Sequence, residues 1–277
     1  MKTILVTGST AGFGKLIVQA FLKNGDQVIA TGRRLSERTE IFAADRALYG
    51  KKLIEMDLDV SSPAEVENIL SKIQTLDVLI NNAGYGLFGA LEDCSEKEIN
   101  YQMDVNFYGT VRLIKLFLPL LRTSQGKIFN FSSAFGYMGF PLTSLYCASK
   151  FAIEGLTESL RSELAPHHVQ VCLIQPGGFT TDFIKNVNWS STISPVYKLQ
   201  VDNYKKLHTF QSRWTPQNPE IVSKGLVRLA NKKNIPLRKR FGRDSHFGHI
   251  FRKLMPTCFY DGIMGLIHKV VFQNKFI

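Results

Sequence analysis

Short apolar runs of strand length alternate with longer stretches of helical periodicity from residue 2 to about residue 175. This alternation is typical of repeated strand–helix–strand units, which place their strands side by side in a parallel sheet. The sequence therefore predicts an α/β fold. The expected strands are Lys2–Thr7, Gln27–Thr31, Lys51–Met56, Asp77–Ile80, Lys127–Phe131 and Val169–Ile174.

Local start and stop signals locate several helices. The first is expected from about Gly12 to Lys23, because Asn24-Gly25 is a C-terminal stop signal. A second begins at Pro63 with Ser62 as its N-cap, since proline needs no amide donor at the first helical position. A later helix is expected from Pro219 to Ala230. The sequence has no repeat, low-complexity tract or linker, so we expect one domain with an irregular, aromatic-rich insertion near residues 182–215.

The charge of the chain is concentrated near its C-terminus. Its 277 residues are 44% hydrophobic, enough to bury a sizeable core, which excludes disorder as the main state. The 34 Lys and Arg residues exceed the 23 Asp and Glu residues by 11. From Lys232 onward ten basic residues accompany two acidic ones, so this stretch carries +8 and the first 231 residues only +3. The question of an anionic partner therefore concerns the tail.

Cysteine spacing and hydropathy indicate the compartment. The four cysteines form no CxxC pair and no metal-ligand pattern, so we expect reduced thiols and no metal site. The chain reaches Gly8 before the apolar core of a signal peptide has room to form. No apolar run approaches the roughly 18 residues that a membrane span requires. The expectation is a soluble, cytoplasmic protein.

A glycine-rich turn joins the first expected strand to the first helix. Gly8 permits the tight turn, while Gly12 and Gly14 let a pyrophosphate approach the backbone and let the helix pack on the strand. The helix N-terminus then offers free amides and a partial positive charge to the anion. The alternative is that the glycines serve only a tight connection, but the strand before and the helix after favour a dinucleotide site. The expected cofactor-binding residues of the turn are Gly8, Ser9, Thr10, Gly12, Phe13 and Gly14.

The end of the second expected strand indicates which dinucleotide binds. An acid there would bind a ribose 2′-hydroxyl, but the sequence Ala30–Arg34 has a small residue at that position followed by two arginines. A guanidinium fork pairs bidentately with a 2′-phosphate. Arg33 and Arg34 therefore favour NADP(H) over NAD(H), with two solvated loop arginines as the alternative.

Tyr146 and Lys150 are four residues apart and would be neighbours on one helix face. An ammonium near a phenol favours the phenolate, and so lowers a pKa that is about 10 in a free tyrosine. This would bring the tyrosine toward acid–base chemistry at neutral pH. A helix-surface pair is the alternative. Ser132-Ser133 closes the fifth expected strand, and Ser133 precedes Tyr146 by 13 residues, far enough for a loop to fold back onto the next helix.

Together these motifs resemble the short-chain dehydrogenase/reductase family over residues 2 to about 245. The resemblance implies a single-domain Rossmann fold with a doubly wound, seven-stranded parallel sheet. It implies a catalytic domain at 1–245, with a substrate lid at about 182–215, and a C-terminal helical extension at 246–277. The motifs, in the order and spacing of the family, are Thr7–Gly14, Asn81–Gly84, Asn106, Ser133, Tyr146 with Lys150, and Pro176-Gly177.

The resemblance also implies a catalytic set. Tyr146 would donate a proton to a carbonyl oxygen or accept one from a hydroxyl, and Ser133 would hold that oxygen. Ser133 is chosen over Ser132 because the family places its serine 13 residues before the tyrosine. Lys150 would lower the pKa of Tyr146 and bind the nicotinamide ribose, while Asn106 would position a water that connects Lys150 to solvent. Both Tyr146 and Lys150 are also implied as cofactor-binding residues.

Three further residues are implied as cofactor contacts. Asn82 would line the adenosine side, Asp59 would contact the adenine, and Thr181 would contact the nicotinamide carboxamide. The activity implied is an NADP(H)-dependent oxidoreductase that transfers a hydride between the nicotinamide and a carbonyl or secondary alcohol. The alternative is a non-catalytic NADP(H)-sensing protein that regulates a partner. Intact Ser133, Tyr146 and Lys150 favour the enzyme, since a sensor needs no proton-transfer set.

Aromatic residues are dense in the expected lid, which favours a small hydrophobic substrate. The alternative is that these rings only pack the lid onto the body. The rings are Phe183, Trp189, Tyr197, Tyr204, Phe210 and Trp214.

The tail resembles that of the 17β-hydroxysteroid and retinol dehydrogenase group. Leu237–Phe241 resembles the last strand of the family, and an apolar stripe in 259–271 follows a helix at His249–Leu254 that Pro256 ends. The stripe would cover the substrate cleft or a subunit interface, or contact a membrane surface weakly; a nucleic-acid surface is the least favoured reading. By analogy with the family, we expect a homodimer or homotetramer paired through helices near 100–122 and 144–165, and no nucleic-acid partner.

Overall fold

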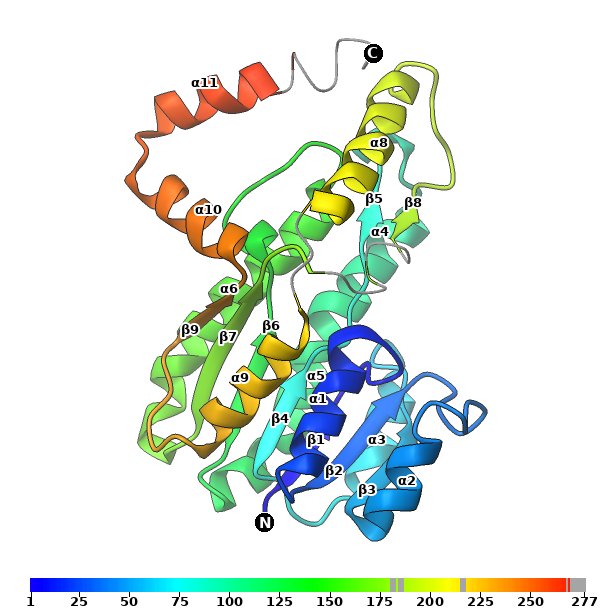
Figure 1. Ribbon diagram of the computed structural model, residues 1–277, viewed down its shortest axis with the longest axis vertical. Helices are drawn as coiled ribbons and strands as arrows, with labels where there is room; N and C mark the ends of the chain where they lie inside the picture. The colour runs from blue at the N-terminus through cyan, green and yellow to red at the C-terminus, as the bar shows by residue number, and fades with distance from the viewer. Residues whose placement is uncertain (180–182, 184–186, 215–217, 268, 270–277) are drawn as a thin grey trace.

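A parallel sheet of seven strands forms the centre of the molecule (Figure 1). The computed structural model describes residues 1–179, 183, 187–214, 218–267 and 269. The strand order is β3-β2-β1-β4-β6-β7-β9, which confirms the predicted doubly wound Rossmann fold. The strands are β1 (Thr3–Val6), β2 (Gln27–Gly32), β3 (Leu53–Asp57), β4 (Val78–Asn81), β6 (Lys127–Phe131), β7 (Gln170–Pro176) and β9 (Arg238–Phe241).

Helices cover both faces of this sheet because its strands are apolar on both sides. On one face the core includes Phe21 of α1 and Leu226 of α9; on the other it includes Ile69 of α3, Phe117 of α5 and Leu160 of α6. The first face holds α1 (Gly12–Lys23), α2 (Ala43–Tyr49) and α9 (Glu220–Asn231), and the second holds α3 (Pro63–Leu70), α5 (Gly109–Thr123) and α6 (Ser144–Glu163).

The predicted local signals agree with these bounds. Helix α1 has the predicted limits and ends before Asn24-Gly25. The Ser62 side chain accepts a hydrogen bond from the Glu65 amide at the start of α3, with Pro63 in the first turn, which confirms the predicted cap. These features depend on short-range sequence, which is why the sequence predicts them well.

The predicted lid is more regular than expected. Most of it is helix α8 (Lys198–Trp214), preceded by β8 (Asn188–Trp189), which pairs with β5 (Leu87–Phe88) in a small second sheet. Val201 and Tyr204 lie one helical turn apart and are buried against Phe88. The expectation of an irregular insertion was wrong here because that helical spacing was overlooked. Lid residues 182, 184–186 and 215 lie outside the described residues.

The C-terminal extension contains two helices, α10 (Arg243–Leu254) and α11 (Thr257–Ile267), separated at Pro256 as predicted. Helix α10 begins before the expected His249, so the boundary predicted between residues 245 and 246 falls inside it. The reason is that its first turn is anchored to the sheet: Ser245 is buried, and its hydroxyl donates to the Gln175 carbonyl at 2.9 Å. No described helix is both long enough and apolar enough to cross a membrane.

Part of the basic tail serves the fold. Arg238 forms ion pairs with Glu154 and Glu158 of α6. Arg240 makes a hydrogen bond with His249 of α10 at 2.9 Å. The +8 of the tail is therefore not a single solvated surface, since two of its arginines connect β9 to neighbouring helices.

Candidate active site

The glycine turn lies where the strand order reverses, between β1 and β4. In such sheets ligands bind at the carboxyl ends of the strands beside this point. Gly8 follows β1 with a φ of 65°, in the left-handed region that favours glycine. Asn82 follows β4, and its side-chain amide donates to the Thr7 and Gly8 carbonyls at 2.9 and 3.1 Å. The predicted Gly8 and Asn82 thus meet, and Asn82 fixes the shape of the turn.

The turn leaves its backbone open to a ligand. A Cβ added at Gly14 would overlap the Gly8 carbonyl, and one added at Gly8 would lie 2.8 Å from the Cα of Ala83, so neither position admits a side chain. The N-cap of α1, Ala11, makes no side-chain cap, so no side-chain cap competes for the first amides of that helix. A bare helix N-terminus behind a glycine cradle suits the pyrophosphate of a dinucleotide.

Two side chains of the turn point into the protein. The Ser9 hydroxyl donates to the Thr31 carbonyl at 2.9 Å. The Phe13 ring packs 5.4 Å from the Phe179 ring and 6.0 Å from the Phe131 ring, measured between centroids. Contacts of Ser9 and Phe13 with a cofactor would therefore come from the backbone. Thr10 lies against Gly32 at the end of β2, and Gly12 has a φ of 52°.

A cavity of about 720 Å³ opens beside the end of β2. The predicted Arg33, Arg34 and Asp59 all line it, so the structure brings these three residues together. The Asp59 carboxylate accepts hydrogen bonds from the Ser61 amide and hydroxyl at 2.9 and 2.6 Å, which orders the rim. The remaining lining residues are Arg38, Met56, Asp57, Glu65, Asn68, Ile69 and Lys72.

Four basic and three acidic side chains line this cavity. Arg33 donates to the Tyr101 hydroxyl at 2.7 Å, which holds its guanidinium in place. Within the described part of the chain, no ion pair or side-chain hydrogen bond engages Arg34, whose backbone has a φ of 49°. Arg38 and Lys72 were missed by sequence reasoning because they lie on later segments, four residues beyond Arg34 and just after α3.

Tyr146 and Ser133 face each other at the carboxyl end of β6. Their hydroxyls share a hydrogen bond, and Tyr146 is only 5% exposed. Ser132 points elsewhere: its hydroxyl is buried without a partner among the described residues. Lys150 donates to the Phe131 carbonyl at 2.9 Å and lies 5.7 Å from the centre of the Tyr146 ring. Spacing alone predicted the Tyr146–Lys150 neighbourhood, and the structure adds Ser133 to it.

Burial controls the titration of this pair. Burial raises the pKa of Tyr146 well above its usual value, and the hydrogen bond with Ser133 opposes this rise. The net direction is opposite to the lowering expected from Lys150, because the loss of solvent outweighs the other effects on the phenol. Burial also lowers the pKa of Lys150 to about 8, while the Glu154 carboxylate acts to raise it.

Asn106 lies in a π-helical turn, Asp104–Tyr108, between α4 (Glu96–Met103) and α5. Such turns occur frequently at functional sites. The Asn106 amide bonds both the amide and the carbonyl of Tyr85, at 3.0 and 2.9 Å, so its orientation is fixed. A Cβ added at Gly84 would lie 3.1 Å from Asn106 Oδ1 and 3.6 Å from Lys150 Nζ. Asn106 and Lys150 therefore border the same small space.

Aromatic rings surround Tyr146. The rings of Phe183, Phe88 and Phe135 lie 5.7, 5.9 and 6.0 Å from its centroid. Of the lid residues, Tyr204 and Trp189 pack on Phe88, as in the alternative that the lid rings serve packing. Phe88 and Phe135 were missed by the sequence analysis because neither lies in a recognised motif. Thr181 lies outside the described residues, as do the side chains of Phe210 and Trp214.

Comparison with known proteins identifies the family of the chain. The sequence model of the short chain dehydrogenase family matches residues 2–191. The chain is 37% identical to the 3-ketodihydrosphingosine reductase of Bacteroides thetaiotaomicron, over 87% of this chain and 88% of that protein. It is 35% identical to human retinol dehydrogenase 8, over 86% of this chain and 81% of that protein.

A solved structure gives the same assignment. A short-chain dehydrogenase from Streptomyces avermitilis superposes with a TM-score of 0.80 at 30% identity, covering 97% of this chain and 96% of that one. The chain therefore belongs to the short-chain dehydrogenase/reductase family and is an oxidoreductase with a Rossmann nucleotide-binding fold.

Proposed function

We propose that the protein is an NADP(H)-dependent oxidoreductase that interconverts a carbonyl and a secondary alcohol on a small hydrophobic substrate. The observation that carries this proposal is the set formed by Ser133, just after β6, and the buried Tyr146 and Lys150 of α6. A protein that only senses a nucleotide has no use for a hydroxyl pair and a buried amine beside its cofactor site. This set favours the enzyme over the sensor.

The proposed chemistry uses each of these side chains in one role. Tyr146 donates the proton to the carbonyl oxygen during reduction, and the rise in its pKa keeps it protonated at neutral pH. Ser133 holds the substrate oxygen by a hydrogen bond and keeps it beside Tyr146. Lys150 binds the nicotinamide ribose, and Asn106 orders a water beside it. When bound, the nicotinamide supplies or accepts the hydride.

The residues of the cofactor site fit NADP(H). Gly8, Gly12 and Gly14 form the pyrophosphate cradle in front of α1. Arg33 and Arg34 supply the charge that a 2′-phosphate needs, in a cavity large enough for an adenosine phosphate. Asp59 and Asn82 border the adenosine side, and Thr181 is proposed for the carboxamide by family resemblance.

We propose an apolar substrate because the rings of Phe88, Phe135 and Phe183 pack around the Tyr146 ring. The names of the two relatives, which refer to a sphingoid ketone and to retinol, support the same class. In a series of alkyl ketones with NADPH, kcat/KM should rise roughly fourfold per buried methylene, equivalent to about 0.8 kcal/mol. NADPH oxidation followed by absorbance measures this. Efficient turnover confined to polar ketoses would contradict the assignment.

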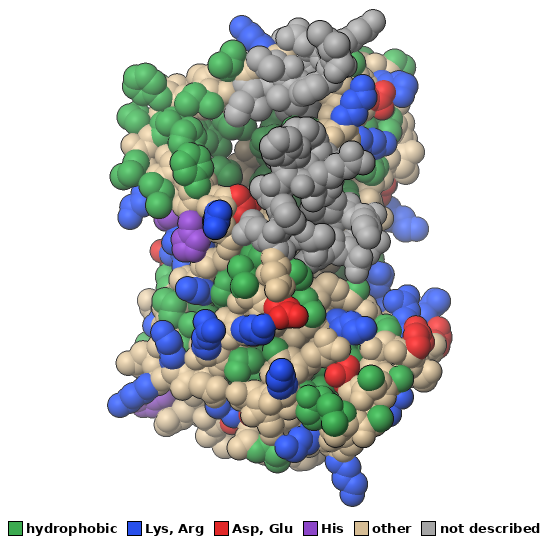
Figure 2. Space-filling view, viewed as in Figure 1, with side chains coloured by type: hydrophobic (Ala, Val, Ile, Leu, Met, Phe, Trp, Pro, Cys, Tyr) green, Lys and Arg blue, Asp and Glu red, His purple; other side chains and the backbone are tan. Residues whose placement is uncertain are grey.

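The tail presents a second surface. Figure 2 shows hydrophobic side chains gathered over α10 and α11. They are 56% to 75% exposed: Phe247, Ile250, Leu254, Phe259 and Leu266. The exposure of Phe259 favours a surface contact for this end of the predicted stripe over a cover on the substrate cleft. Since the basic Arg252 and Lys253 end α10 beside this patch, we propose that it makes a weak peripheral contact with an anionic membrane surface of the cytoplasm.

Flotation with vesicles tests this contact. The protein should float with phosphatidylserine vesicles and less with neutral ones, and the Phe247→Ser/Leu254→Ser variant should lose flotation. We propose that oligomers form elsewhere, through α5 and α6, where Tyr108 just before α5 and Phe151 of α6 are 51% and 46% exposed. The double variant should therefore keep the oligomeric state of the wild type in light scattering. If it becomes smaller while vesicles capture neither protein, the patch binds a second copy and the membrane proposal fails.

A further inference from the structure

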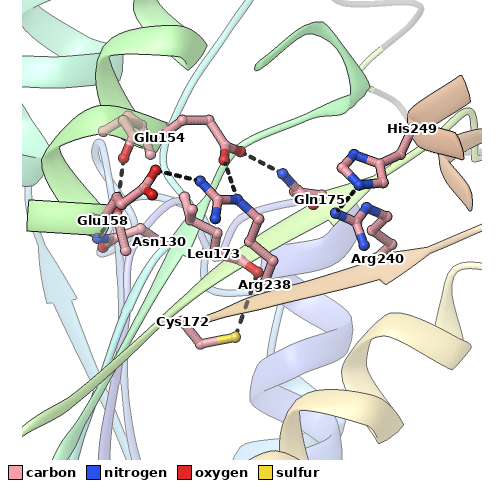
Figure 3. A network of polar contacts seen from close by, with 11 residues as sticks. Asn130, Glu154, Glu158, Cys172, Leu173, Gln175, Arg238, Arg240 and His249 are labelled. Carbon is pink, nitrogen blue, oxygen red and sulfur yellow. Dashed lines mark hydrogen bonds and ion pairs between the residues drawn. The ribbon is translucent and has the colours of Figure 1, made fainter. Parts of the chain in front are cut away.

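Lys150 and Glu154 lie one turn apart on the same face of α6, and both are buried, at 5% and 8% exposure. A buried carboxylate is rare unless other groups hold it. Glu154 is held from two strands of the sheet: it accepts a hydrogen bond from the Gln175 amide of β7 at 2.8 Å and from Arg238 Nε of β9 at 3.1 Å. Figure 3 shows the three side chains converging.

The carboxylate has little freedom to move away. Arg238 is itself fixed by Glu158 at 2.7 Å, so the ion pair with Glu154 is part of a chain of contacts. A Cβ added at Gly136 would lie 3.2 Å from Glu154 Oε1, so the loop before α6 closes against the carboxylate. Such a network keeps a charge at a fixed place in the low-dielectric interior, where its field on a neighbour is strong.

Several charged or titratable groups face Glu154 from the surrounding elements. Burial lowers the pKa of Lys150, and Glu154 is the charge that opposes this change. Arg238 compensates the Glu154 charge from β9, which makes its burial tolerable. The groups are Lys150 and Glu158 on α6, Arg238 and Arg240 on β9, Cys172 on β7, and Tyr137 before α6.

We propose that Glu154 is a positioning residue for proton transfer, whose buried carboxylate, fixed by Gln175 and Arg238, keeps Lys150 in its ammonium form at the pH of catalysis. This inference rests on the proposed roles of Tyr146 and Lys150. It gives a function to the last strand of the sheet: Arg238 on β9 supports the active site through α6 without touching substrate or cofactor.

The test is the pH profile of NADPH-dependent reduction by the Glu154→Gln variant. Without the carboxylate, the amine loses its proton at lower pH, so the alkaline limb of kcat/KM should move down by about one pH unit. Activity below that limb should remain. Glu158→Gln is the matched control, because Glu158 also bonds Arg238 but its side chain is 60% exposed and lies a further turn from Lys150. Its profile should coincide with that of the wild type.

Two additional variants distinguish the loss of the Glu154 charge from a folding defect. Glu154→Asp keeps the charge and should restore the limb toward the wild-type position. Glu154→Gln/Arg238→Gln removes both partners of the ion pair, so it leaves no guanidinium without its partner, and it should show the same downward move. Unchanged limbs in both glutamine variants, or equal loss of activity at every pH, would overturn the proposal. Failure of the proposed function is distinct, because the wild type itself would then show no turnover that depends on Tyr146.

Discussion

Replacing Tyr146 with phenylalanine should reduce kcat for carbonyl reduction by about 10³-fold, within the range expected when a general acid is lost. The proton that the alkoxide needs would have no donor, since the role proposed for Ser133 is only to hold the substrate oxygen. The affinity for NADPH should change little, because the glycine turn and Arg33 with Arg34 lie on the other side of the cofactor site. Steady-state NADPH oxidation and fluorescence titration measure the two quantities.

Tyr146→Phe should remove the hydroxyl without disturbing the packing around it. Phenylalanine keeps the ring that packs against Phe88 and Phe135. The Ser133 hydroxyl keeps a partner, since it accepts a hydrogen bond from the Phe135 amide at 3.2 Å. Tyr137→Phe is the matched control: the Tyr137 hydroxyl is half-buried and donates to the Ser245 carbonyl, and this variant should keep most of its activity. Similar losses in both variants would count against a special role for Tyr146.

Replacing Arg34 with aspartate should weaken NADPH binding by about 10²-fold and leave NADH binding nearly unchanged. A charge-assisted hydrogen bond is worth about 1.5 to 3 kcal/mol, and the new carboxylate would repel the 2′-phosphate as well. Because no described side chain engages Arg34, its loss disturbs no contact of the fold. Titration of both dinucleotides against the variant gives the ratio of their affinities.

Arg33→Asp should also weaken NADPH binding, and it removes the hydrogen bond to Tyr101 as well. Lys51→Asp makes the same change of charge at an exposed residue that is not among the described lining of the cavity, and its two affinities should match those of the wild type. If the wild type bound NADH as tightly as NADPH, or if Lys51→Asp lowered NADPH affinity as much as Arg34→Asp, the preference for NADP(H) would be wrong.

Much of the fold could be predicted because its signals are local. Six expected strands lie within two residues of their observed ends, since each is a short apolar run bounded by turn residues, whereas the basic seventh strand was expected from the family resemblance. The glycine turn, the Ser62 cap and the spacing of Tyr146 from Lys150 are equally local. These motifs also bring together Gly8 with Asn82 and Arg33 with Asp59, because parallel strands end at one edge of the sheet.

Features that depend on distant contacts could not be predicted. The two-residue strands β5 and β8 become a sheet only when the lid packs on Phe88. Burial decides that the pKa of Tyr146 is raised, and burial cannot be inferred from the spacing of Tyr146 and Lys150. The pairing of Glu154 with Arg238 joins α6 to a strand 84 residues later, so a basic segment of the tail turned out to belong to the core.

The fate of the hydride tests the central claim most directly. The wild type, given an apolar ketone that it turns over and NADPH with both C4 hydrogens replaced by deuterium, should yield an alcohol with deuterium on its carbinol carbon, and Tyr146→Phe should yield almost none. Tight NADPH binding without any transfer to a carbonyl would contradict the account and favour a nucleotide sensor. Equal transfer by wild type and Tyr146→Phe would contradict the assigned proton donor.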